Sequence, residues 1–154
     1  MRNDLHVLFK VADAEYAVPA ADVLHMESFT GATRVPGTRH YVVGLMQIRN
    51  RVVPIVDLRV RFGLPEAAVT IDSRVIVVQS EARAVGLLVD SAREVIAIAP
   101  DAFSAPPDTI TEQAQGYVTS LAQAGKRLVM LIDLGKVIGE EALSGEQQRD
   151  QQHA

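Results

Sequence analysis

The sequence predicts an all-β fold made of two similar half-units, each of about five strands and closed by a short helical turn. The first observation is an internal repeat: residues 41–63 return as residues 117–139, with 9 of 23 positions identical, where composition alone would give about one or two. The second is that apolar runs are short, rich in valine and isoleucine, and separated by turn residues, which is typical of strands. The third is that both copies end in Asp-Leu followed by a short helical pattern and a glycine.

Ten short strands with brief connections indicate an antiparallel barrel or sandwich. Pro54 falls inside a strand pattern, so we expect that strand to lie at an edge or to bend. Residues 101–108 end with two prolines and a polar residue, and we expect an unpaired loop there. The expected strands are residues 5–11, 15–19, 22–28, 42–49, 51–57, 74–80, 84–90, 92–98, 117–124 and 127–133, with hairpin turns at 13–14, 49–50 and 124–126.

The helical turns after the two Asp-Leu pairs have natural N-caps in Asp57 and Asp133, whose carboxylates can accept from free backbone N–H groups. A weaker repeat of apolar positions links residues 7–26 with residues 76–95, at an offset of 69 instead of 76. The second half therefore carries seven additional residues, which we place in the proline-containing loop near 100–116.

Half-units of about 70 residues are marginal alone, so a shared core is expected. We predict one domain over residues 1–140, made of two intertwined subdomains, followed by a disordered polar tail over residues 141–154, which is glutamine-rich and without period.

Composition excludes several classes of protein. A net charge of −4 and an aromatic content of 5% argue against a nucleic-acid partner, which would favour a basic, aromatic-lined face. No cysteine is present, so disulfides and thiol chemistry are impossible. The first residues do not resemble a signal peptide, and no apolar run approaches the roughly 20 residues that cross a bilayer. We expect a cytoplasmic protein without direct membrane insertion.

Catalytic and metal-binding patterns are weak. The four histidines, at positions 6, 25, 40 and 153, have no helical ligand spacing, and no nucleophile elbow or phosphate-binding loop occurs. We therefore predict no metal and no cofactor. Asp57, Asp90 and Asp133 could serve a small hydrolase as carboxylates, but capping and strand-end roles explain them better.

Arg49 ends an apolar strand. Its spacing favours a solvated turn over the alternative, which is an arginine presented at an interface for binding carboxylates.

An ordered series of motifs resembles the bacterial chemotaxis coupling protein family (CheW-like), over roughly residues 5–140. Any single motif is weak, and it is their order along the chain that is specific. The motifs are Phe9 with Tyr16-Ala17-Val18-Pro19, Val23, Arg34-Val35-Pro36, Tyr41-Val42-Val43-Gly44-Leu45, Ile48-Arg49, Val53-Pro54-Ile55-Val56-Asp57-Leu58, Val85-Gly86-Leu87-Leu88-Val89-Asp90, Glu94-Val95, Pro106-Pro107 and Gly116-Tyr117-Val118.

The resemblance implies two intertwined five-stranded SH3-like barrels around a shared apolar core, and a non-enzymatic adaptor. Such an adaptor joins the cytoplasmic tip of a chemoreceptor (a methyl-accepting chemotaxis protein) to the regulatory domain of a chemotaxis histidine kinase, in receptor arrays at the inner face of the membrane. A non-flagellar chemosensory pathway, such as twitching motility, is the alternative setting.

The resemblance also implies a receptor-binding groove between the barrels, while edge turns would meet the kinase. Two departures from the family pattern bear on it: Asn50 stands where a glycine is common, and His25 stands where an acid is common. Arg49 is therefore expected to pair with Glu27 or with an acid of the receptor. The groove residues implied are Val23 and His25 from one strand, Gly44 and Arg49 from the next, and Gly86 and Ala92 from the second barrel.

Overall fold

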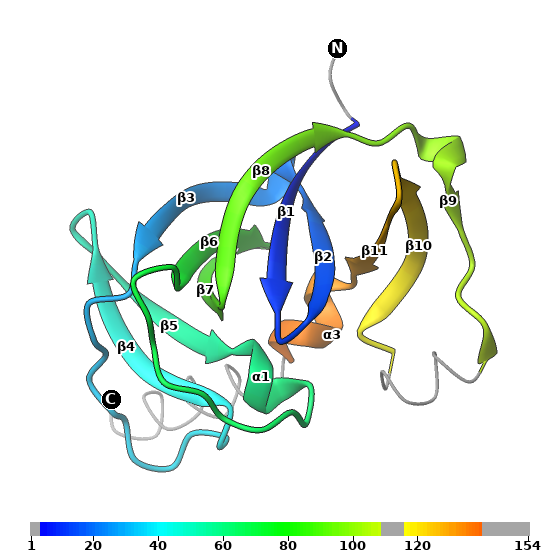
Figure 1. Ribbon diagram of the computed structural model, residues 1–154. Helices are drawn as coiled ribbons and strands as arrows, with labels where there is room; N and C mark the ends of the chain where they lie inside the picture. The colour runs from blue at the N-terminus through cyan, green and yellow to red at the C-terminus, as the bar shows by residue number, and fades with distance from the viewer. Residues whose placement is uncertain (1–3, 109–115, 140–154) are drawn as a thin grey trace.

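Two β-sheets and short helical turns make up the described part of the protein (Figure 1). The computed structural model describes residues 4–108 and 116–139, so the tail predicted at 141–154 lies outside the described residues. In these two ranges no helix is long and apolar enough to cross a bilayer. The elements are β1 (Leu5–Val11), β2 (Ala14–Pro19), η1 (Ala20–Asp22), β3 (Val23–Ser28), β4 (Val42–Ile48), β5 (Arg51–Asp57), α1 (Leu58–Arg61), β6 (Arg74–Ser80), β7 (Arg83–Val89), β8 (Ser91–Ala97), η2 (Pro100–Ala102), β9 (Phe103–Ser104), β10 (Val118–Ala124), β11 (Arg127–Ile132) and α3 (Leu134–Ile138).

The two halves of the chain exchange hairpins. Barrel 1 is the five-stranded sheet of order β3-β6-β7-β5-β4, and barrel 2 is the six-stranded sheet of order β8-β1-β2-β11-β10-β9. Replacing each strand of barrel 1 by its counterpart in the sequence repeat gives the first five strands of barrel 2 in the same order. The β6–β7 hairpin of the second half thus completes the barrel of the first half, and β1–β2 does the reverse. The predicted intertwining of two barrels is confirmed.

The irregularities of the sheets repeat as well. A bulge at Val43 in the β4–β5 ladder has its counterpart at Thr119 in β10–β11. In the same way, Leu24 lacks a partner in the β3–β6 ladder and Arg93 lacks one in the β8–β1 ladder. The connection after β8 (98–117) is seven residues longer than the connection after β3 (29–41), where the sequence placed the insertion.

The exchanged hairpins are buried on both faces. On β1, Phe9 packs into the core shared by both halves, whereas its neighbour Leu8 packs into the separate core of barrel 2. On β6, Ile76 faces the shared core and Val77 faces the core of barrel 1. Each such side chain stabilises the fold by about 1.5–3 kcal/mol, so the central strands are apolar at nearly every position.

Three local expectations are corrected by the structure. Of the two alternatives for the strand holding Pro54, an edge position is wrong, since β5 lies between β7 and β4. Its parallel pairing with β7 begins only at Ile55, so the missing N–H of Pro54 interrupts no bond of that ladder. The sheets are not purely antiparallel, because β5 with β7 and β2 with β11 run parallel. Residues Phe103 and Ser104 pair with β10, so the predicted loop contains a short strand before its prolines.

Arg61 of α1 joins the two halves. Its Nε donates to the carbonyl of Val137 at 2.8 Å and its terminal nitrogen donates to the carbonyl of Lys136 at 2.8 Å. The guanidinium carbon also lies 4.1 Å from the ring centre of Tyr41 and 5.0 Å from that of Tyr117, which are equivalent positions in the repeat. A cation here satisfies carbonyl groups that the end of α3 leaves without helical partners.

Replacing Arg61 by alanine should lower the free energy of unfolding by about 2 kcal/mol, because two charge-assisted hydrogen bonds to carbonyls disappear. Chemical denaturation measures the loss. Arg51→Ala removes the same charge from an exposed position and should change stability by less than about 0.5 kcal/mol. Equal stabilities of the two variants would show that Arg61 does not hold the halves together.

Candidate functional site

The β4–β5 hairpin presents Arg49 at a tight turn. Arg49 and Asn50 both have positive φ, 49° and 66°, as a two-residue hairpin of the mirror-image type requires. Asparagine tolerates this conformation well, so the hairpin keeps its shape although Asn50 replaces the glycine common in the resembled family. The turn carries the arginine to the solvent-exposed tip of barrel 1.

Arg49 bridges the two edge strands of barrel 1. Its Nε donates to Oε2 of Glu27 at 3.0 Å, and Glu27 lies on β3 whereas Arg49 follows β4. This confirms the expectation that Arg49 turns to Glu27. The pair is exposed, so it contributes no more than about 1 kcal/mol to stability, and a partner can reach it.

A twin of this ion pair closes barrel 2. Arg127, in the β10–β11 hairpin, donates to Glu94 of edge strand β8 at 2.6 Å and to Glu15 at 3.4 Å. The hydrogen bond from Arg127 holds the pKa of the Glu94 carboxyl below its usual value. The Arg127–Glu94 pair therefore stabilises the fold above the unfolded-state pKa of Glu94. This stabilisation is lost as the pH falls through the folded-state pKa of Glu94. In both barrels, an arginine on a hairpin tip binds a glutamate on an edge strand. The Arg49–Glu27 pair therefore belongs in part to the common structure of the two barrels.

Val23 and His25 of β3 are half-buried and face different surroundings. Val23 stands opposite Val78 and packs on the shared core, whereas His25 stands opposite Val77, which belongs to the core of barrel 1. The bulge at Leu24 separates the two positions. The structure therefore brings His25 to the same sheet face as Glu27, but it does not bring Val23 there.

Gly44, Gly86 and Ala92 are buried. Gly44 has φ +151°, and a Cβ there would lie 2.2 Å from the carbonyl oxygen of Thr33, so only glycine allows this close approach. A Cβ on Gly86 would meet side chains of Ile55 and Val75 at 2.6 and 2.7 Å, and Ala92 belongs to the shared core.

These three residues shape the backbone and present no side chain to a groove. Gly86 also belongs to barrel 1, and not to barrel 2 as the resemblance implied, because β7 is one of the exchanged strands.

Met26 and Val95 are surface residues that the sequence reasoning missed. They occupy the same position of the weaker repeat, and their side chains are 40% and 53% exposed. Met26 stands opposite Ile76 and Val95 opposite Val7, and both of these partners face the shared core. Met26 and Val95 therefore share a sheet face with residues of that core while their own side chains stay exposed, one on each edge strand. The repeat itself was the signal that could have found them.

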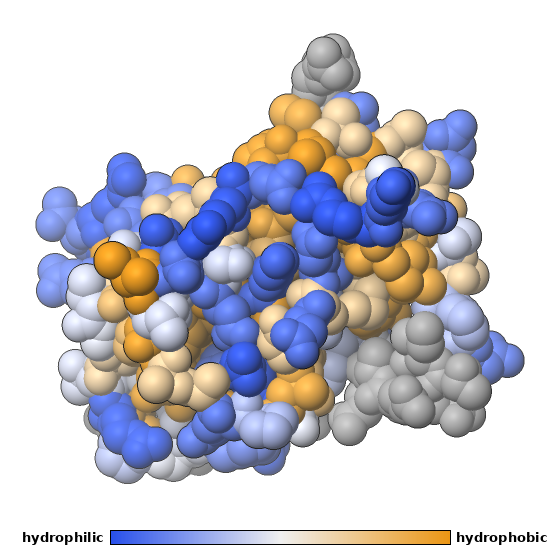
Figure 2. Space-filling view, viewed as in Figure 1, coloured by the Kyte–Doolittle hydropathy of each residue, from blue (hydrophilic) through white to orange (hydrophobic). Residues whose placement is uncertain are grey.

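Polar and apolar side chains occupy separate areas of the exterior. Figure 2 shows a hydrophilic band across the middle of the viewed face, with apolar patches on either side of it.

Within residues 4–108 and 116–139, no group of three or more His, Cys, Asp or Glu side chains could hold a metal ion.

The three carboxylates of the hydrolase alternative each have a structural partner. Asp57 caps α1 by accepting from the backbone N–H of Arg59 at 2.9 Å, and Asp133 caps α3 by accepting from that of Lys136 at 3.2 Å. Asp90 accepts from the guanidinium of Arg59 at 2.7 Å and from the backbone N–H of Ala12 at 2.8 Å. Both predicted caps are confirmed, and Asp133 belongs to a different helix from the Asp57–Arg59–Asp90 group.

Comparison with known proteins identifies the family. The family model described as CheW-like domain matches residues 5–142. The chain belongs to the CheW-like domain family. Chemotaxis protein CheW of Bacillus subtilis is 30% identical over 136 residues, which are 88% of this chain and 87% of that protein. Chemotaxis protein CheW of Rhizobium meliloti is 30% identical over 135 residues, 88% and 87% of the two chains.

A solved structure agrees with this assignment. The scaffolding protein TtCheW from Thermoanaerobacter tengcongensis superimposes with a TM-score of 0.79 at 27% identity, over 85% of this chain and 89% of that one. The protein is thus a CheW-like chemotaxis scaffold of mainly β structure, and the resemblance inferred from the ordered motifs is confirmed.

Burial makes Asp57 a useful probe of the cap. Burial raises the pKa of its carboxyl above the ordinary value, and hydrogen bonds from the backbone of Arg59 and Val60 lower it in part. The ionised form therefore costs stability above the folded-state pKa, and this cost disappears below the unfolded-state value.

Asp57→Asn should be at least as stable as the parent at neutral pH, and it should lose this advantage as the pH falls. Asp57→Ala should be about 1 kcal/mol less stable than Asp57→Asn, because alanine offers no acceptor to the helix. Thermal unfolding between neutral and acidic pH tests both. An asparagine variant as unstable as the alanine variant would contradict the capping role.

Proposed function

We propose that this protein is a coupling adaptor that joins the cytoplasmic tip of a chemoreceptor to the regulatory domain of a chemotaxis histidine kinase, within receptor arrays at the inner face of the membrane. The observation that carries the proposal is the CheW-like match over residues 5–142. It is supported by the scaffolding protein that shares the fold and by the structural roles of the three aspartates.

The receptor is proposed to bind at the rim between the barrels. A chemoreceptor tip is a helical hairpin, and an amphipathic helix binds by laying apolar side chains against an apolar surface. Met26 and Val95 offer such a surface, one from each barrel. Glu27 near the end of β3 binds Arg49 of the β4–β5 turn, and the charge of Arg49 would set the register of the bound helix.

His25 lies on β3 together with Glu27. Gly44, Gly86 and Ala92 would act indirectly, by fixing the backbone that carries these side chains, and Val23 would act through the shared core.

Arg49→Ala should weaken receptor binding about fivefold or more, since an exposed arginine at a helix-binding rim is a typical energetic centre. Co-sedimentation with receptor-containing membranes measures the affinity. Arg127→Ala is the matched control, because it breaks the twin ion pair in barrel 2 and should leave receptor binding unchanged.

Glu27→Gln sharpens this test. It frees Arg49 from its internal partner, so receptor binding should be kept or strengthened. Normal binding by a folded Arg49→Ala variant would remove Arg49 from the receptor surface.

The kinase is proposed to bind the hairpin tips. Val52 on β5 and Leu128 on β11 are equivalent in the repeat, and their side chains are 65% and 57% exposed. The resemblance implies that the kinase regulatory domain shares this fold, so a pseudo-symmetric contact would place like surfaces together. Exposed apolar side chains at two matched tips suit that contact.

Val52→Asp and Leu128→Asp should each weaken binding to the purified regulatory domain about tenfold, with the fold kept because both positions are exposed. Ile71→Asp is the control, since Ile71 is an equally apolar side chain, 91% exposed, outside both hairpins. Isothermal titration gives the affinities. If neither tip variant differs from the Ile71 variant, the hairpin tips are not the kinase surface.

A further inference from the structure

The segment between β3 and β4 (residues 29–41) is held in a defined shape. The backbones of Thr33 and Leu45 exchange two hydrogen bonds of 2.8 Å, which is the close approach that Gly44 permits. Farther along, the hydroxyl of Thr38 donates to the carbonyl of Val35 at 3.1 Å, and the backbone N–H of Val42 donates to the carbonyl of Arg39 at 3.0 Å. A segment tied at several points can hold side chains in place before a ligand arrives.

A cavity of about 310 Å³ lies between this segment and the start of β4. Its polar walls include Arg34, Arg39 and His40, and its apolar walls include Val35 and Val42. Among the residues that the structure describes, no acidic side chain lines it, although the whole chain carries a net charge of −4. None of its lining residues is among the residues proposed to bind the receptor or the kinase.

Arg34 and His40 retain hydrogen-bonding capacity. Within residues 4–108 and 116–139, neither Arg34 nor His40 forms an ion pair with a carboxylate. Two acids, Asp57 and Glu66, line an adjoining cavity of about 400 Å³ that is also lined by Arg34 and His40.

Asp57 already accepts from the N–H of Arg59. A guanidinium fork with free donors binds an oxyanion in two parallel hydrogen bonds.

We propose that the cavity lined by Arg34, Arg39 and His40 binds a carboxylate side chain of a protein partner, a glutamate or aspartate flanked by apolar residues. Its size is at the lower limit for small-molecule sites, which suits one inserted side chain better than an enclosed metabolite. The two valines supply apolar contact beside the charged donors, as expected for an acidic side chain on an apolar peptide. The proposal goes beyond the coupling function, because it adds a binding site outside both surfaces assigned above.

The test titrates the full chain, labelled with nitrogen-15, with the peptide acetyl-Leu-Glu-Leu-amide and with its neutral counterpart acetyl-Leu-Gln-Leu-amide. The glutamate peptide should shift the amide signals of Val35, Val42 and Val43, and the glutamine peptide should not. Arg34→Gln should weaken binding of the glutamate peptide about fivefold, which corresponds to the contribution of an exposed ion pair.

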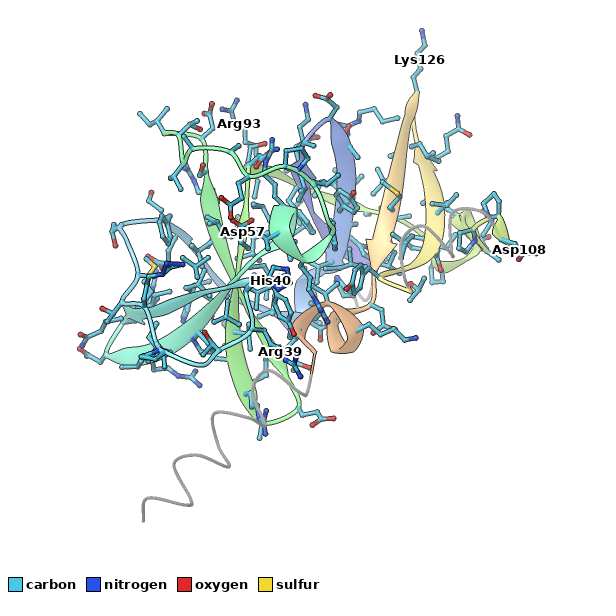
Figure 3. The ribbon with its side chains drawn as sticks, turned by 90° about the horizontal axis from the view of Figure 1, so that it is seen from below. Arg39, His40, Asp57, Arg93, Asp108 and Lys126 are labelled. Carbon is cyan, nitrogen blue, oxygen red and sulfur yellow. The ribbon has the colours of Figure 1, made fainter. Side chains whose placement is uncertain are left out.

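Lys126→Gln is the matched control, since Lys126 projects from the tip of the β10–β11 hairpin, away from Arg39 and His40 (Figure 3), and it should leave the affinity unchanged. Thermal unfolding confirms that each variant is folded.

Three outcomes would overturn the proposal: equal shifts with both peptides, shifts that map elsewhere, or unchanged affinity in folded Arg34→Gln. Inorganic phosphate serves as a competitor. If phosphate shifts these amides while the glutamate peptide does not, the site takes a small free anion and the assignment to a protein side chain is wrong. Because receptor and kinase binding use other residues, failure here leaves the coupling function untouched.

Discussion

The fold depends on burying both faces of two exchanged hairpins. Each of β1–β2 and β6–β7 lies between the core of one barrel and the core shared by both halves. Neither face could be exposed without losing several kilocalories per mole for each strand, so the halves cannot separate and remain folded. Arg61 reinforces this junction where the helices meet, between the two equivalent tyrosines.

This arrangement also determines what remains for partners. Because the exchanged hairpins are internal, edge strands β3 and β8 and the β4–β5 and β10–β11 hairpins carry exposed apolar side chains. These elements come in pairs related by the repeat, so each surface on one barrel has a counterpart on the other. A partner can therefore distinguish the two barrels only by the residues in which counterparts differ. His25 corresponds to Glu94, and the two arginine–glutamate pairs are built from different positions of the repeat.

Local features of the structure could be predicted from the sequence. Strand bounds were within one or two residues and both helix caps were correct, because alternation of apolar residues and an aspartate before a helical turn act over a few residues. Pairing partners could not be predicted in the same way. Pro54 in an internal strand, the short pairing of Phe103 and the barrel that holds Gly86 all depend on strands distant in the sequence. Met26 and Val95 were passed over because an apolar residue in a strand reads as core until the register is known.

The exchange of hairpins has a consequence for synthesis on the ribosome. Barrel 1 lacks its inner strands until Val89 has emerged, and barrel 2 cannot assemble before β11 at Ile132. During that interval the β1–β2 hairpin can form its own hydrogen bonds but has no sheet to join. Its apolar side chains, including Phe9 and Val18, are then exposed to water. Nascent chains with exposed apolar surface tend to aggregate with other chains. The strands that are translated first are therefore the ones that stay unprotected for the longest time.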